Sequence, residues 1–256
     1  MNFIQPSIDP VILSISFFEL RWYSLAYILG IIIGFFIIKR LNVIKGSLIS
    51  VKQLDSFFVW AVLGIILGGR FGYVLFYQIN VFYNNPIYLI EIWNGGMSFH
   101  GGLLGVIIST FIFCRNNNLK FYYVADFVAL VAPIGLFFGR IANFINSELV
   151  GKQTDLVWGV IFPLIDSTPR HPSQLYEAIL EGVLLFIIMN IIYFSKNYKM
   201  GDCSFKFLIF YGIFRIFSEF FREPDEQIGF LIGSFSMGMM LSILMIFVGV
   251  VLYRIK

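Results

Sequence analysis

An all-α, polytopic membrane protein is the fold class that this sequence predicts, on two observations. First, 59% of the 256 residues are hydrophobic and only 13% are charged, whereas a soluble globular domain has about 25% charged residues. Second, the apolar residues form continuous runs of about 17 to 22 residues, while strands of a membrane barrel would alternate apolar and polar residues. The composition excludes a water-soluble enzyme, a disordered chain and a disulfide scaffold.

Seven apolar runs between polar breaks are predicted to be membrane-spanning helices. Each has about the length that crosses roughly 30 Å of hydrocarbon at about 1.5 Å per residue. Little of the chain remains for a soluble domain, so residues 1–256 are predicted to form a single integral-membrane domain. The seven segments are residues 18–38, 56–76, 98–114, 124–141, 174–194, 205–222 and 231–252.

Lys and Arg residues predict the orientation, because loops rich in these residues stay in the cytoplasm. In a seven-span arrangement, 11 of the 18 fall in loops on one side, which places the N-terminus outside and the C-terminus in the cytoplasm. Those 11 are Lys39, Arg40, Lys45, Lys52, Arg115, Lys120, Lys196, Lys199, Lys206, Arg254 and Lys256. The others lie at outer helix ends or inside spans: Arg21, Arg70, Arg140, Lys152, Arg170, Arg215 and Arg222.

The first two spans carry aromatic residues near their outer ends, and the second also carries a cation. Aromatic side chains such as Tyr23 are typical of a membrane interface. Arg70 lies inside the second span, where an arginine costs about 2.5–3.5 kcal/mol on insertion scales. Structural pairing or snorkelling and a functional role both remain open for Arg70. Residues 79–93 are predicted to lie along the outer interface instead of crossing.

The third span begins around His100, which stands between two pairs of adjacent glycines. Glycine lets a backbone or a substrate chain approach closely, and histidine exchanges a proton near neutral pH. These features favour a functional role over a structural histidine. The chain has only two histidines and two cysteines, so we expect no metal site and no cofactor.

The fourth span ends in a polar run. Arg140, Asn143 and Ser147 fall at positions i, i+3 and i+7, which is one face if the helix continues that far. Glu148 and Gly151 follow directly. The run therefore offers a cation, amides and a carboxylate together, which favours a binding site over a plain solvated loop.

The fifth span contains two carboxylates, Glu177 and Glu181, one helical turn apart in an otherwise apolar helix. Each needs a partner, because an unpaired buried charge is costly. Pairing with an arginine and a catalytic role remain equally open.

The sixth span places Arg215, Glu219 and Arg222 on one face, at i, i+4 and i+7. An internal salt bridge would account for part of this pattern. Spare positive charge beside Arg140 and Arg222 near the outer leaflet favours a bound anion. The seventh span is an apolar run.

Glycines at small-xxx-small spacing predict close contacts between helices. They are Gly64, Gly68 and Gly72 in the second span, Gly101 and Gly105 in the third, and Gly135 and Gly139 in the fourth.

Arginines beside a hydrocarbon-lined cavity suit a phospholipid head group, since guanidinium binds phosphate through a bidentate fork. The same arginines would stabilise the charge that a phosphate leaving group gains. The sequence shows no strained serine turn and no Cys–His pair, so we expect the nucleophile to arrive with a second substrate.

Four long motifs carry a family resemblance: GGMSFHGGL at 95–103, GRIANFINSE at 139–148, RHPSQLYE at 170–177 and FRIFSEFFR at 214–222. LRWY at 20–23 and GGR at 68–70 match as well. With these motifs in the same order, the chain resembles the prolipoprotein diacylglyceryl transferases of bacterial lipoprotein maturation from about residue 9 to the last span.

The resemblance implies transfer of the diacylglyceryl group of phosphatidylglycerol to the lipobox cysteine thiol of a preprolipoprotein, forming a thioether and releasing glycerol phosphate. It implies a single catalytic domain in the bacterial cytoplasmic (inner) membrane, with the active site towards the outer (periplasmic) face. The implied partners are phosphatidylglycerol, the preprolipoprotein signal peptide and membrane lipids, and no nucleic acid is expected.

The resemblance also implies roles for individual residues. Arg140 and Arg215 would hold the phosphate, and His100 would be the base or orient the lipid. Which group takes the thiol proton stays open. The implied catalytic residues are Tyr23, His100, Arg140, Arg215 and Glu219; the implied substrate-binding residues are Arg70, Arg140, Asn143, Glu148, Gly151 and Arg215. The chain departs from the family pattern at Ala142 and Ser147, where glycine is expected.

Two other functions were weighed. A transporter or channel for an anionic lipid or solute would place polar residues along a complete path through the membrane, and transporters often contain inverted repeats. The polar groups here concentrate towards the outside, and no repeat is visible. A structural lipid-binding protein would need the arginines but not His100. The enzyme is therefore the favoured interpretation.

Overall fold

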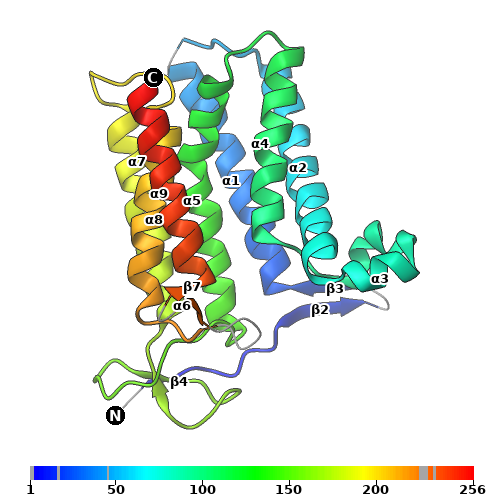
Figure 1. Ribbon diagram of the computed structural model, residues 1–256, viewed down its shortest axis with the longest axis vertical. Coiled ribbons are helices and arrows are strands. Elements are labelled where there is room, and N and C mark those ends of the chain that lie inside the picture. Colours follow the sequence, from blue (N-terminus) through cyan, green and yellow to red (C-terminus); the bar gives the residue numbers. More distant parts are fainter. Residues whose placement is uncertain (1–2, 16–17, 45, 225–229, 233–234) are drawn as a thin grey trace. The chain divides into compact units, whose positions relative to one another are not determined.

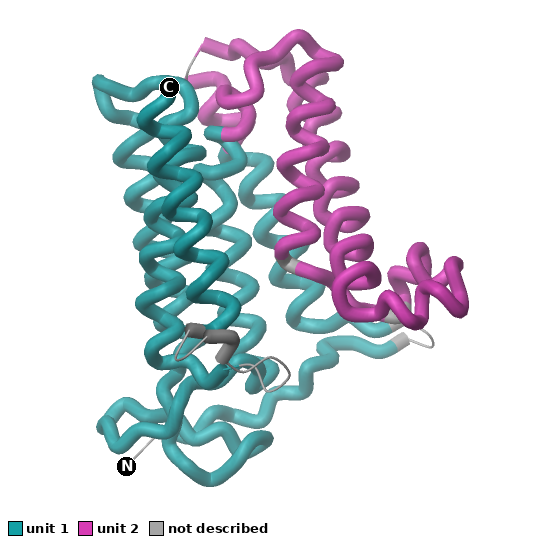
Figure 2. Tube along the Cα trace, in the orientation of Figure 1, with its two compact units in different colours: residues 1–37, 126–256 teal, residues 38–125 magenta. Residues whose placement is uncertain are grey.

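The protein is mostly helical in the computed structural model (Figure 1), which describes residues 3–15, 18–44, 46–224, 230–232 and 235–256. The chain forms two compact units (Figure 2). Unit 1 comprises residues 1–37 and 126–256, and unit 2 comprises residues 38–125. The residues of the fourth, fifth and sixth predicted spans that were singled out for function all belong to unit 1.

The described part of the chain contains twelve helical segments and seven short strands. The helices are α1 (Trp22–Ile44), α2 (Val51–Tyr77), α3 (Ile79–Asn84), η1 (Pro86–Leu89), η2 (Ile92–Asn94), α4 (Phe99–Asn116), α5 (Phe121–Ile145), α6 (Ser173–Glu177), η3 (Ala178–Leu184), α7 (Leu185–Tyr193), α8 (Asp202–Glu219) and α9 (Met237–Ile255). The strands are β1 (Phe3–Ile4), β2 (Val11–Ile15), β3 (Phe18–Arg21), β4 (Val160–Ile161), β5 (Pro169–Arg170), β6 (Phe230–Ile232) and β7 (Phe235–Ser236).

A long helix occupies most of each of the seven predicted segments, and α6, η3 and α7 together form the fifth. Among the described residues, five helices are long and apolar enough to cross a membrane: Trp22–Ile44, Val51–Tyr77, Phe121–Ile145, Ser173–Tyr193 and Met237–Ile255. The predicted class of helical, polytopic membrane protein is therefore confirmed.

Two predicted helix starts are wrong. Residues 18–21 form β3, which pairs antiparallel with β2, and the helix begins at Trp22. Residues 230–232 and 235–236 form the β6–β7 pair, and α9 begins at Met237. The side chain of Ser236 accepts a hydrogen bond from Met239 N and so caps α9. An apolar run alone does not reveal a short strand that precedes a helix.

Unit 2 is built on close packing between α2 and α4, which lie side by side (Figure 1). A Cβ atom added at Gly105 would overlap the Gly64 carbonyl, and one at Gly68 would overlap that of Gly101. The predicted glycine contacts between the second and third spans are confirmed.

In α5, Gly135 lies close to α1, since a Cβ added at Gly30 would be 2.9 Å from Gly135 Cα, which confirms a close helix contact there. A Cβ at Gly139 would meet open space, so the predicted close contact at Gly139 is wrong.

We expect Gly105→Ala to destabilise unit 2, because the added methyl group would push two backbones apart; overpacking of this kind costs about 1–3 kcal/mol. The matched control is Gly102→Ala in the same helix, where a Cβ would lie at an ordinary 3.7 Å from Ile65 O. Thermal unfolding in detergent measures both variants. Equal melting temperatures for the two variants would contradict this account of the α2–α4 contact.

The N-terminal segment of unit 1 holds the end of α5. Strand β1 pairs parallel with β4, and the Gln5 side chain that follows is 1% exposed. Its Nε2 donates to the carbonyls of Phe144 and Ile145, both at 3.1 Å, and its Oε1 accepts from Ser147 Oγ at 3.0 Å. Gln5 thus satisfies carbonyl groups at the end of α5 that have no partner within the helix. No sequence pattern predicts this contact, because Gln5 and its carbonyl partners lie 139 and 140 residues apart.

We expect Gln5→Leu to lower the stability of unit 1 by about 1–3 kcal/mol, the cost of leaving buried polar groups unsatisfied. Gln153→Leu is the control, because Gln153 is exposed. Denaturant unfolding followed by tryptophan fluorescence compares the two variants. A Gln5 variant as stable as the wild type would show that these hydrogen bonds do not secure the helix end.

Asp126 joins the other end of α5 to the start of α8. The side chain is fully buried and accepts hydrogen bonds from the Tyr198 hydroxyl (2.6 Å), Gly201 N (2.7 Å) and Ser204 N (2.8 Å) and Oγ (2.6 Å). Asp126 therefore caps α8 from a neighbouring helix. The two helices that carry Arg140 and Arg215 are tied together by this contact.

Candidate active site

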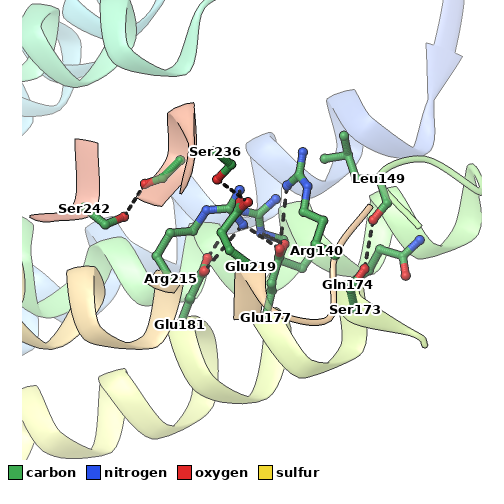
Figure 3. A network of polar contacts seen from close by, with 12 residues as sticks. Arg140, Leu149, Ser173, Gln174, Glu177, Glu181, Arg215, Glu219, Ser236 and Ser242 are labelled. Carbon is green, nitrogen blue, oxygen red and sulfur yellow. Dashed lines mark hydrogen bonds and ion pairs between the residues drawn. The ribbon is translucent and has the colours of Figure 1, made fainter. Parts of the chain in front are cut away.

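Six charged side chains from α5, the α6–η3 helix, α8 and the residues just after α8 form one buried cluster within unit 1. The close-up in Figure 3 shows the arginine and glutamate side chains turned towards one another. Its members are Arg140, Glu177, Glu181, Arg215, Glu219 and Arg222, with side-chain exposures of 15%, 0%, 0%, 11%, 6% and 7%. We call these residues the arginine–glutamate cluster.

Glu177 lies at the centre of the arginine–glutamate cluster. Its Oε2 is 2.8 Å from Arg140 Nε, and its Oε1 is 2.5 Å from Arg215 Nη1 and 3.6 Å from Arg222 Nη1. Glu181 bridges the same two arginines at longer range, with Oε2 3.2 Å from Arg140 Nη2 and Oε1 3.8 Å from Arg215 Nη1. Two carboxylates therefore share the space between the same pair of guanidinium groups.

Glu219 completes the arginine–glutamate cluster from within α8. It forms an ion pair with Arg215 Nη2 and accepts a hydrogen bond from Ser236 Oγ at 2.7 Å. A Cβ at Gly238 would lie 2.6 Å from Glu219 Oε1, so a larger residue there would displace the Glu219 carboxylate. These contacts hold the Glu219 carboxylate and the Arg215 guanidinium group in place.

The arginine–glutamate cluster contains equal numbers of guanidinium and carboxylate groups. The expectation of spare positive charge is therefore wrong, while the interpretation of Glu177 and Glu181 as arginine partners is confirmed. The physical reason is the cost of burying an ion: each guanidinium removed from water needs a counterion. The spacing of the two glutamates in an apolar run was the signal for this pairing.

The helix that carries both glutamates changes its winding at this point. Residues Ala178–Leu184 form a π-helical segment that contains Glu181. Gly182 lies against Phe137 of α5, and a Cβ there would be 2.7 Å from Phe137 Cβ. Such π segments are uncommon and frequently occur at functional sites. No local sequence pattern predicted it.

A second polar group surrounds the loop after α5. Asn143 is 3% exposed, and its Nδ2 donates to Glu148 Oε2 at 3.0 Å. The Glu148 carboxylate is exposed, while its main-chain oxygen accepts from Gln174 Nε2 at 2.7 Å. Ser147 has a φ of +56°, a conformation that favours glycine, which explains why glycine is expected there. Its hydroxyl instead bonds to Gln5.

Gly151 lies where two backbone segments meet. Its N–H donates to the His171 carbonyl at 3.0 Å, its own carbonyl accepts from Arg170 Nη1 at 3.1 Å, and a Cβ would overlap the His171 carbonyl. Arg170 also pairs with Asp166 at 2.6 Å, and this hydrogen-bonded cation holds the pKa of Asp166 well below its usual range. Gly151 and Arg170 thus shape the loop around the site.

Tyr23 lies in the first turn of α1. Its ring centroid is 5.2 Å from that of Tyr27, one helical turn further along α1. The predicted site residue Tyr23 therefore belongs to unit 1, the unit that contains the arginine–glutamate cluster.

Arg70 of unit 2 is 1% exposed, and its guanidinium is engaged by main-chain carbonyls. It donates to the carbonyls of Tyr88 (2.6 Å), Leu89 (3.4 Å), Gly95 and Gly96 (3.4 Å). The guanidinium carbon also lies 4.6 Å from the centroid of the Tyr88 ring. Arg70 therefore holds the segment after α3 in place, and its role as a substrate ligand stays a prediction.

His100 of unit 2 lies in the first turn of α4 and is exposed. Ser98 caps this helix by accepting a hydrogen bond from Gly101 N at 3.2 Å, and its own N–H donates to the Gly69 carbonyl at 2.9 Å. The helix start that carries His100 is thus fixed to α2. Among the described residues, no group of His, Cys, Asp and Glu side chains is arranged to hold a metal ion.

Comparison with known proteins identifies the family. Residues 10–255 match the family model described as prolipoprotein diacylglyceryl transferase. The chain belongs to the prolipoprotein diacylglyceryl transferase family. The phosphatidylglycerol--prolipoprotein diacylglyceryl transferase of Rhodospirillum rubrum is 50% identical, over 97% of this chain and 92% of the relative. That of Allorhizobium ampelinum is 49% identical, over 95% of this chain and 88% of the relative. That of Pseudoalteromonas atlantica is 52% identical over 92% of this chain and 83% of its own.

Unit 1 brings together most of the residues that the family motifs implicate. Arg140, Arg215 and Glu219 lie in the arginine–glutamate cluster, and Asn143 and Glu148 form a hydrogen-bonded pair at the end of α5. His100 and Arg70 belong to unit 2. Glu177, Glu181 and Arg222 stood out in the sequence but were not among the residues implied by the family motifs, and Gln5 was not expected at the site.

Proposed function

We propose that this enzyme transfers the diacylglyceryl group of phosphatidylglycerol to the lipobox cysteine of a preprolipoprotein. The thiol sulfur forms a bond to the terminal glycerol carbon, the bond from that carbon to the phosphate oxygen breaks, and glycerol phosphate leaves. The thiol proton is the one proton that must be removed. The family and the named relatives support this reaction.

One observation carries the assignment of the phosphate site. Arg140 and Arg215 are bridged by the same carboxylates, Glu177 and Glu181, so both guanidinium groups converge on one anion position. A phosphate that takes the place of a carboxylate there contacts both arginines. Guanidinium groups held in this way would stabilise the charge that develops on the leaving phosphate.

The lipid needs room beside these arginines. A Cβ added at Gly139 of α5, which directly precedes Arg140, would meet no atom within 4 Å. We assign this open face of α5 to the glycerol part of the lipid. Asn143 and Tyr23 supply hydrogen bonds to the substrates, and Glu148 and Gly151 shape the rim of the site.

His100 is the proposed base for the lipobox thiol. An unperturbed thiol has a pKa near 8.5, so only a few per cent is ionised at about pH 7, and a base accelerates the attack. His100→Gln should remove the histidine limb from the pH–rate profile. Unchanged kinetics across pH would assign the proton to another group.

The proposed setting is the bacterial cytoplasmic membrane, with a single catalytic domain of seven spans. The N-terminus lies outside, the C-terminus lies in the cytoplasm, and the arginine–glutamate cluster faces the outer leaflet. The asymmetric distribution of Lys and Arg supports this orientation. In this arrangement α4 and α8 cross the membrane as well, although α8 contains four charged residues: Asp202, Lys206, Arg215 and Glu219.

The direct test supplies purified protein in detergent with labelled phosphatidylglycerol and a lipobox peptide. We expect a glyceryl thioether on the peptide cysteine, together with released glycerol phosphate. No thioether, combined with lipid or solute flux across protein-containing vesicles, would replace the transferase with the transporter.

A further inference from the structure

The three carboxylates of the arginine–glutamate cluster are not held equally. Glu177 meets three guanidinium groups, two of them within 2.8 Å. Glu219 is held by Arg215 and by Ser236. Among the described residues, Glu181 forms no ion pair shorter than 3.2 Å, and its second one is 3.8 Å long. One oxygen of each of Glu177 and Glu181 accepts no hydrogen bond within the described part of the chain, so the ion-pair distances are what separates the two carboxylates. Of the three, Glu181 is therefore the carboxylate that an incoming anion displaces most easily.

Substrate binding changes the charge of the arginine–glutamate cluster. With every member ionised, three guanidinium groups face three carboxylates, and the net charge is zero. A phosphodiester brings one negative charge, and a buried excess of one charge is costly. Neutrality in the complex therefore requires that one carboxylate carries a proton.

We infer that Glu181 carries a proton when the phosphodiester is bound, so that the phosphate replaces the Glu181 carboxylate between Arg140 and Arg215. This inference rests on the proposed phosphate site. In binding, one O–H bond forms at the Glu181 carboxyl and the proton comes from solvent; it returns to solvent when glycerol phosphate leaves. Glu181 is thus a positioning residue that makes lipid binding dependent on pH.

The groups that face Glu181 support this choice. Arg140 approaches from α5, Arg215 and Tyr211 interact with it from α8, and Glu177 lies on its own helix. Protonation of Glu177 would leave three guanidinium groups without their shared partner. Protonation of Glu181 weakens only its own two contacts, at 3.2 and 3.8 Å, and leaves the shorter ion pairs of Glu177 with Arg140 and Arg215 intact.

Infrared difference spectroscopy tests the inference on the full-length protein, in detergent, with phosphatidylglycerol bound. The wild type should show the carbonyl stretch of a protonated carboxylic acid, and Glu181→Gln should lack it. Asp155→Asn, which alters an exposed carboxylate in the same unit, should keep the band. A band that is absent from the wild type, or unchanged in Glu181→Gln, would overturn the inference.

The pH dependence of lipid binding gives a second readout. Protonation in the complex means that wild-type binding of phosphatidylglycerol weakens as pH rises, by up to about tenfold per pH unit for one proton. Glu181→Gln mimics the protonated acid, so its binding should be independent of pH. A Glu181→Gln variant that keeps the wild-type pH dependence would contradict the inference.

The experiments distinguish an error in the proposed phosphate site from an error in the proposed protonation of Glu181. Arg140→Lys that binds phosphatidylglycerol as tightly as the wild type would refute the phosphate site. Weakened lipid binding in Arg140→Lys, with the carboxylic acid band retained in Glu181→Gln, would refute the role of Glu181 alone.

Discussion

Arg140→Lys and Arg215→Lys should each lower the rate of transfer by about 10²–10³-fold, the usual cost of removing one group that stabilises developing negative charge. Lysine keeps the positive charge that Glu177 and Glu181 require, so the buried cluster stays neutral. Lysine lacks the planar guanidinium group, whose several N–H donors let one arginine contact a carboxylate and a phosphate together. The loss should therefore appear in activity and not in folding.

The measurement is thioether formation on a lipobox peptide, with thermal unfolding of each variant as the folding control. Arg115→Lys, at the exposed end of α4, is the matched control and should transfer at the wild-type rate. Wild-type turnover in either the Arg140 or the Arg215 variant would remove that arginine from the phosphate site.

Glu177→Ala should destabilise unit 1 by about 3–5 kcal/mol, the cost of leaving a buried ion without its partner. Glu177 is 0% exposed and contacts Arg140, Arg215 and Arg222, so its removal leaves the cluster with an uncompensated positive charge. No other described side chain lies at the centre of the three guanidinium groups.

Unfolding in detergent measures this loss. Glu19→Ala is the control: Glu19 pairs with Arg21 at the surface, with exposures of 60% for Arg21 and 45% for Glu19, and exposed pairs contribute only about 0–1 kcal/mol. The double variant Glu177→Ala/Arg222→Ala restores neutrality and should recover part of the stability. Similar melting temperatures for Glu177→Ala and Glu19→Ala would show that the cluster does not support the fold.

The helices could be predicted from the sequence because their cause is local: long apolar runs and glycine spacing. The contact between α2 and α4 follows from Gly64, Gly68, Gly101 and Gly105. The short strands, the capping of α5 by Gln5 and the π segment around Glu181 could not be predicted in this way. These features depend on partners far away in the sequence.

The charged residues of the site could be predicted from the sequence, but the net charge of the cluster that they form could not. Charged side chains in apolar helices marked Arg140, Arg215 and Glu219 for attention. Spare positive charge was expected because the partners of these arginines come from other helices, and spacing within one helix does not reveal them. The partners of Arg70 are likewise not revealed by spacing within one helix, because they are carbonyls of a following segment.

The most direct test of the phosphate site is a nitrogen–phosphorus distance. Solid-state NMR of the full-length protein in bilayers, with ¹⁵N-labelled arginine, detects coupling between guanidinium nitrogens and the phosphorus of phosphatidylglycerol. We expect coupling to two arginines, one lost in Arg140→Lys and the other in Arg215→Lys. Phosphorus coupling that survives both substitutions, or is absent from the wild type, would contradict the assignment of these two guanidinium groups to the lipid phosphate.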